Sequence, residues 1–116
     1  MNHRDAAVPL DEVRLEMRLT ARGLTAPRLT PDDISAQIKH EHYYVFPGTT
    51  LTVCALELKN GFMVTGESAS ASPENFNADI GREIAFRNAR DKIWAFEGYL
   101  LKQHLHLIEQ MKGEAS

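Results

Sequence analysis

Apolar residues in the C-terminal third of the chain recur at spacings of three, four and seven positions, which predicts one long helix. The stripe that they form consists of Phe86, Ala89, Ile93, Phe96, Leu100 and Leu107. Ser72 and Pro73 suit a helix start, because a serine oxygen can accept an amide hydrogen bond and proline lacks the amide that would be wasted there. After a break near Phe76, Asn77 or Asp79 could cap a second start.

Two stretches upstream of this helix, Leu51–Lys59 and Phe62–Glu67, predict a β-hairpin because they are rich in apolar and β-branched residues. The Asn60-Gly61 pair between them is typical of a type I′ turn, which needs positive φ at both central residues. Gly66, near the end of the second stretch, indicates a close backbone approach or a bulge.

A short helix is predicted ahead of the hairpin, because Thr30-Pro31 followed by two acids is a strong helix start. The helical pattern fades near His40, and Glu41 to Phe46 then has the composition of a strand. The predicted fold class is α+β: a small antiparallel sheet, built on a central hairpin, packs with a short N-terminal helix and a long C-terminal helix.

The length of 116 residues fits one small domain, which we place at residues 29–116 behind an N-terminal extension at residues 1–28. Apolar residues between Leu10 and Leu24 recur near helical spacing, with acids early and arginines later, as a helix dipole favours. Both a helix that ends at Gly23 and a variable, unpacked extension fit this pattern.

Composition and charge narrow the functional classes. Hydrophobic residues make up 43% of the chain and charged residues 25%, which are ordinary globular values. A net charge of −3 argues against a general binder of nucleic acid or of membrane surfaces. We expect no membrane span and no signal peptide, and the single Cys54 fits a reducing cytoplasm. A chain this small covers a long apolar seam poorly, so we expect a homo-oligomer.

Patterns that support catalysis or metal binding are weak. Two His-x-His pairs, His40/His42 and His104/His106, come without further ligands at metal-site spacing. Cys54 lies among apolar residues, as a buried structural thiol does. The serines after the hairpin lack a nucleophile elbow and a triad. We therefore predict no metal, no cofactor and no enzymatic activity.

A cationic flank on the long helix is the strongest candidate for binding. It consists of Arg82, Arg87, Arg90 and Lys92, with Asn88 between them. Arginine forks suit phosphate, Asn88 could bond a base edge, and Phe76 in the preceding loop could stack on a base. The predicted ligand site is Phe76, Asn88, Arg82, Arg87 and Arg90. The alternative is a solvated helix face with salt bridges, because Glu83 and Asp91 adjoin two of the arginines.

Several motifs between Thr30 and Lys102 resemble a family of small phage and prophage accessory proteins of the podophage type. In order, they are DDISAQIKHEHYYV, KNGF, GES-x-x-x-SPENF, IGR, RNA-x-x-KIW and EGYLL.

The same pattern is similar to the first described family of Thoeris anti-defence proteins, which sequester the cyclic ADP-ribose-type signal made by TIR enzymes. The resemblance implies a sponge for cyclic nucleotides, including CBASS-type cyclic oligonucleotides, that acts in the host bacterial cytoplasm as an oligomer such as a hexamer. It also implies that an aromatic residue and an asparagine, best matched by Phe76 and Asn88, contact the signal, and that helix arginines bind its phosphates. The alternative is an accessory protein that binds a host or phage protein through its helical seam.

Overall fold

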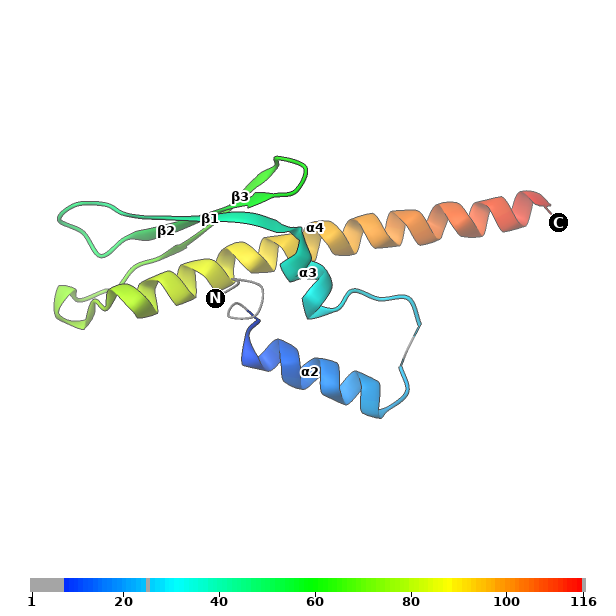
Figure 1. Cartoon of the computed structure of the whole chain (residues 1–116), viewed down its shortest axis with the longest axis horizontal. Coiled ribbons are helices and arrows are strands. Elements are labelled where there is room, and N and C mark those ends of the chain that lie inside the picture. The colour runs from blue at the N-terminus through cyan, green and yellow to red at the C-terminus, as the bar shows by residue number, and fades with distance from the viewer. Residues whose placement is uncertain (1–7, 25, 116) are drawn as a thin grey trace.

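The computed structural model describes residues 8–24 and 26–115, in which a three-stranded sheet packs on one long helix with two shorter helices beside it (Figure 1). The elements are α2 (Leu10–Ala21), α3 (Pro31–Gln37), β1 (Ile38–Val45), β2 (Thr52–Leu58), β3 (Met63–Ser68), a 3-10 turn η1 (Pro73–Asn75) and α4 (Ala78–Ala115). This arrangement confirms the predicted α+β class.

The sheet has the order β1-β2-β3, and both neighbouring pairs are antiparallel. The register places Tyr43 of β1 opposite Cys54 of β2, and Cys54 opposite Gly66 of β3. Strand β1 begins at Ile38, directly after α3 and earlier than the predicted Glu41. Side chains alternate along strands, so this register decides which residues face α4.

The start of α3 is the predicted capping arrangement. The backbone N–H of Asp33 donates to the Thr30 hydroxyl at 3.2 Å, and the backbone N–H of Thr30 donates to the Asp33 carboxylate at 2.9 Å. Two amides that a helix start leaves unpaired are thereby satisfied, with Pro31 in the first helical turn.

The β2–β3 turn differs from the predicted type I′ turn. Among the described residues only glycines have positive φ, so Gly61 (φ +88°) adopts the left-handed conformation and Asn60 does not. The N–H of Gly61 donates to the carbonyl of Leu58 at 2.9 Å, and the N–H of Leu58 donates to the carbonyl of Phe62 at 2.8 Å. This is a three-residue loop in which one glycine supplies the needed conformation.

The core lies between α4 and the face of the sheet that carries Cys54. Its buried apolar residues are Ile34, Ile38, Cys54, Leu56, Leu58, Val64, Ala85, Phe86, Ala89 and Ile93. Gly66 confirms the predicted close backbone approach: a Cβ there would lie 2.2 Å from the backbone nitrogen of Ala89 and 2.3 Å from the carbonyl oxygen of Ala85. Strand β3 therefore rests directly on the backbone of α4.

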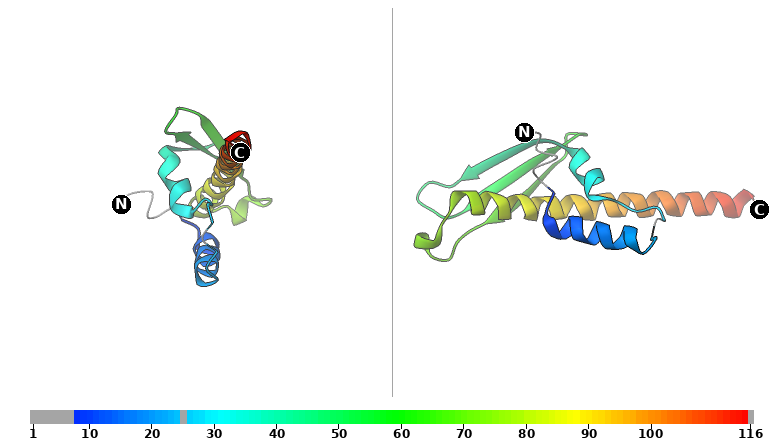
Figure 2. Two further views of the ribbon diagram at one scale, coloured as in Figure 1. Left: turned by 90° about the vertical axis from the view of Figure 1, so that its right-hand side faces the viewer. Right: turned by 60° about the horizontal axis from the view of Figure 1, so that its bottom comes forward.

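The sheet covers only the first half of α4. Ile93 is fully buried, whereas Phe96, Leu100 and Leu107 on the same predicted stripe are 47%, 57% and 48% exposed. Phe96 makes an edge-to-face contact with Phe62, at 5.6 Å between ring centroids. Beyond this contact α4 extends away from the sheet, and the molecule measures 64 × 32 × 28 Å (Figures 1 and 2).

Helix α2 occupies part of the predicted extension, and its C-terminal end is followed by Gly23 at φ +68°. Its acidic side faces the rest of the protein, because Glu12 is buried. Leu15 and Met17, which are 53% and 66% exposed, lie on its solvent side. Polar contacts, and not an apolar stripe, hold this helix in place.

Candidate functional site

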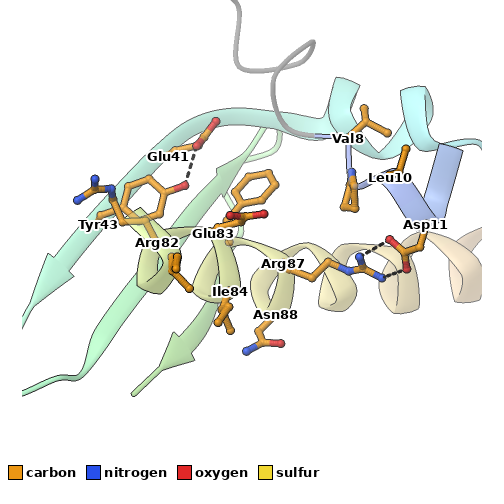
Figure 3. Close-up of a pocket in the computed structure, with 13 residues that line it drawn as sticks. Val8, Leu10, Asp11, Glu41, Tyr43, Arg82, Glu83, Ile84, Arg87 and Asn88 are labelled. Carbon is orange, nitrogen blue, oxygen red and sulfur yellow. Dashed lines mark hydrogen bonds and ion pairs between the residues drawn. The ribbon is translucent and has the colours of Figure 1, made fainter. Parts of the chain in front are cut away.

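An open groove of about 770 Å³ lies between the start of α2, strand β1 and the first half of α4 (Figure 3). Its lining is Val8, Pro9, Leu10, Asp11, Glu41, Tyr43, Ile80, Arg82, Glu83, Ile84, Phe86, Arg87 and Asn88. The groove thus brings together three residues of the predicted ligand site, Arg82, Arg87 and Asn88. Phe76 and Arg90 do not line it.

Arg87 lies in the groove with carboxylates on both sides of its guanidinium. Its Nη1 and Nη2 donate to the two carboxylate oxygens of Asp11 at 2.6 and 2.7 Å, and its Nε donates to Asp91 at 3.0 Å. The hydrogen bond with Asp11 raises the pKa of Arg87 and lowers the pKa of the Asp11 carboxyl. Asp11 therefore occupies the position that a phosphate would need on this arginine.

Arg82 has a partner of its own, Asp79, one turn earlier on α4. Two further carboxylates, Glu41 and Glu83, line the same groove. The groove is therefore mixed in charge, and a phosphate ligand would have to replace carboxylates at the arginines.

Asn88 connects α4 to the sheet. Its side-chain Nδ2 donates to the backbone carbonyl of Glu67 in β3 at 2.8 Å. Its amide oxygen makes no hydrogen bond to any described residue, and it can accept one from a ligand. The side chain thus offers a ligand one acceptor but not its donor.

The prediction that Arg90 belongs to an exposed cationic flank is wrong, because its side chain is 0% exposed. Its Nε and Nη2 donate to the Glu12 carboxylate at 2.9–3.1 Å, its Nη1 to the Ser35 hydroxyl at 3.0 Å, and its Nη2 to the carbonyl of Pro31 at 2.9 Å. The spacing carried a signal for this: Arg90 lies four positions after Phe86, on the core side of the helix. Its carboxylate partner comes from α2, far away in sequence.

Phe76 lies outside the groove, beside a second hollow of about 330 Å³ next to Thr50 and Ser70. Its half-buried ring packs near the start of α4, within 3.7 Å of where a Cβ on Gly81 would be. The structure therefore does not bring Phe76 together with Asn88 in one pocket.

Tyr43 is the aromatic residue that the sequence analysis missed. It lies opposite Cys54 in the register and so shares the α4-facing side of the sheet, where it lines the groove. Its hydroxyl donates to the Glu41 carboxylate at 2.9 Å, and burial is the main cause that raises its pKa. Simple alternation from Ile38 would have placed Tyr43 on the opposite face, and the shift in register between Ile38 and His40 brings both to the same side.

Cys54 is a buried thiol, as predicted, and burial raises its pKa to about 11. Because the thiolate is the reactive form, we expect a thiol reagent to label the native protein very slowly at pH 8. Labelling in urea should be fast. With an aromatic disulfide as the reagent, the absorbance of the thiolate that the reagent releases measures both rates. Rapid labelling at pH 8 with an unchanged circular dichroism spectrum would contradict this expectation.

The described residues contain no group of three or more His, Cys, Asp or Glu side chains placed to hold a metal ion. His40 and His42 have ring centroids 6.3 Å apart on exposed positions of β1. Within residues 8–24 and 26–115, no helix is both long and apolar enough to cross a bilayer.

The fold and the groove together define a small α+β protein with a mixed-charge groove on its long helix. Residues 29–105 match the family described as Phage protein (N4 Gp49/phage Sf6 gene 66), and the chain belongs to this family. No curated protein and no solved structure matches the chain. The matched segment supplies Arg82, Arg87 and Arg90, whereas Asp11 and Glu12 come from α2, outside it.

Proposed function

We propose that this phage protein binds a cyclic nucleotide immune signal in the groove and sequesters it, without cleaving it, in the cytoplasm of the host. The candidate signals are of the cyclic ADP-ribose type made in Thoeris defence, and cyclic oligonucleotides of the CBASS type. One observation carries the proposal: Arg82, Arg87 and Asn88 line one groove beside Tyr43, and its volume of about 770 Å³ lies in the range of small-molecule sites.

Each of these side chains has a role suited to a nucleotide. The arginines offer planar donor forks to phosphate oxygens, and the Asn88 oxygen can accept from a base amino group. Tyr43 replaces Phe76 as the proposed stacking surface, because it lines the groove and is 37% exposed. Arg90 is assigned a structural role, because its guanidinium is fully engaged by Glu12, Ser35 and Pro31.

The lining of the groove favours binding without turnover. Among the described residues that line it, none is a histidine, cysteine, serine or lysine. Two of its carboxylates already accept hydrogen bonds, Asp11 from Arg87 and Glu41 from Tyr43. Neither is therefore placed as a free general base.

Retention and heat release test the proposal. The purified chain is incubated with each candidate signal, separated from unbound ligand, heated, and the released material is analysed by mass spectrometry. Release of the intact signal supports sequestration. An altered product would indicate an enzyme, and failure to retain any candidate would overturn the proposal.

Arg82→Gln should weaken binding of the retained signal roughly ten- to hundredfold, the range for loss of a charge-assisted hydrogen bond. The difference in affinity between the parent and Arg82→Gln should become smaller as salt is raised, because ions screen charges in a groove that is open to solvent. Arg14→Gln is the matched control, since Arg14 is exposed on α2 outside the groove. Equal affinities of the two variants in titration calorimetry would place the ligand elsewhere.

A second candidate function is supported by the distal half of α4, where the apolar stripe continues without cover. Leu100, Leu107 and Met111 are 57%, 48% and 67% exposed. Contiguous exposed apolar surface of this kind marks interaction sites. We propose that it packs against a second copy of the chain, and the alternative function is binding of a host or phage protein through the same surface.

Sedimentation velocity at micromolar concentration should therefore give a species heavier than the 13.1 kDa chain. Leu107→Glu should shift the distribution toward monomer, because it introduces a charge into the stripe. His106→Glu adds the same carboxylate about 100° around the helix from Leu107, outside the apolar stripe, and should change little. A parent protein that sediments as a clean monomer would contradict self-association and favour a different partner.

A further inference from the structure

Two adjacent acids at the start of α2 bind two arginines of α4 in different ways. Asp11 binds Arg87 at the groove, and its side chain is 66% exposed. Glu12 binds Arg90 in the interior, where the two side chains are 8% and 0% exposed. One acid is therefore accessible to solvent and the next is not.

Glu12 anchors the start of α2. Its carboxylate is the only charged partner of Arg90 among the described residues, and the other acceptors are the Ser35 hydroxyl and the Pro31 carbonyl. Withdrawing it would leave a buried cation without a counter-charge, which proteins strongly disfavour. Asp11 is consequently held beside Arg87 whether or not it makes its own ion pair.

Asp11 uses the same contacts that a phosphate group would use. Its two oxygens accept from Nη1 and Nη2 of Arg87 at 2.6 and 2.7 Å, which is the bidentate geometry of arginine with either anion. Figure 3 shows this pair at the end of the groove nearest α2. The side chain of Arg87 is 36% exposed, so a dissolved anion can approach it.

We infer that Asp11 is a tethered competitor for anionic ligands, which occupies the phosphate position of Arg87 until a ligand displaces it. The identity of the natural ligand rests on the proposed function, but the competition does not. Displacement needs only a rotation of the Asp11 side chain, because Glu12 keeps α2 in place.

This arrangement favours anions that bind Arg87 strongly enough to compete with Asp11. An exposed ion pair is weak, but a tethered group acts at an effective concentration in the millimolar range or above. A single weak anion therefore competes poorly. A ligand with two phosphates brings more negative charge to Arg87 and competes better with Asp11.

The inference is tested with inorganic pyrophosphate as the probe and the full chain in low salt. We expect Asp11→Asn to bind pyrophosphate at least fivefold more tightly than the parent in titration calorimetry. Asp32→Asn is the matched control, because it removes one negative charge, as Asp11→Asn does. Asp32 is exposed on α3 and does not line the groove. Adding Arg87→Gln to Asp11→Asn should remove the gain.

Signal retention is measured on the parent and on Asp11→Asn in parallel, so that the two proposals fail separately. If Asp11→Asn binds pyrophosphate more tightly but neither protein retains a cyclic nucleotide, the role of Asp11 as a competitor is supported and the proposed function fails. If Asp11→Asn binds pyrophosphate within twofold of Asp32→Asn, or not at all, with an unchanged thermal melt, the inference is overturned.

Discussion

Replacing Gly66 with alanine is expected to destabilise the protein by more than about 3 kcal/mol, at or beyond the upper end of overpacking effects. The added Cβ would lie 2.2 Å from the backbone nitrogen of Ala89 and 2.3 Å from the carbonyl oxygen of Ala85. Both atoms belong to the backbone of α4, so no side-chain rotation can make room. Strand β3 and α4 would have to separate, and core packing on both sides of Gly66 would be lost.

Urea unfolding followed by circular dichroism measures this effect. Gly98→Ala is the matched control, because Gly98 lies in α4 and a Cβ there meets nothing within 4 Å. That variant should be as stable as the parent or slightly more stable, since alanine favours helix over glycine. A Gly66→Ala protein that unfolds at the parent's midpoint would contradict the packing described for β3.

Removing the carboxylate of Glu12 is the second change with a large expected effect. Glu12→Ala should cost about 3–5 kcal/mol, the range for removing one partner of a buried ion pair. The guanidinium of Arg90 is 0% exposed and would lose its counter-charge while remaining in the interior. The residues ahead of the family-matched segment would then be required for the stability of that segment.

The control for Glu12→Ala is Glu16→Ala, which breaks the ion pair with Arg28 on the same helix. The two side chains of that pair are 26% and 27% exposed, so breaking it should lower the free energy of unfolding much less. The double variant Glu12→Ala with Arg90→Met should recover much of the stability, because it removes the unpaired charge. Equal unfolding midpoints for Glu12→Ala and Glu16→Ala would show that Arg90 does not depend on Glu12.

Local patterns predicted the elements of the fold well. The Thr30-Pro31 cap, the β2–β3 hairpin and the long helix each depend on residues close together in sequence, and each is present. The turn type was wrong because Asn60 tolerates either sign of φ, and hydrogen bonding across Leu58 and Phe62 decided the outcome. Helical period also predicted the apolar stripe correctly, but not how far the sheet would cover it.

The candidate site was less predictable, because charge pairing joins residues far apart in the chain. Arg90 binds Glu12 and Arg87 binds Asp11, and no local spacing connects either pair. Phe76 was placed with Asn88 because one lies in the loop ahead of the long helix and the other on that helix among the arginines, but they lie at different hollows. Tyr43 enters the groove only through the register of β1 on β2.

The uncovered half of α4 has a consequence for how this segment holds its shape. A helix of its length is only marginally stable alone in water, because nucleation is costly and no apolar packing supports it. Its amide hydrogens should therefore exchange rapidly, through local opening that leaves the sheet and the first half of α4 protected. Slow exchange past Phe96 would then report that the exposed face, with Leu100 and Leu107, has been covered, and helical order there would become a measure of association.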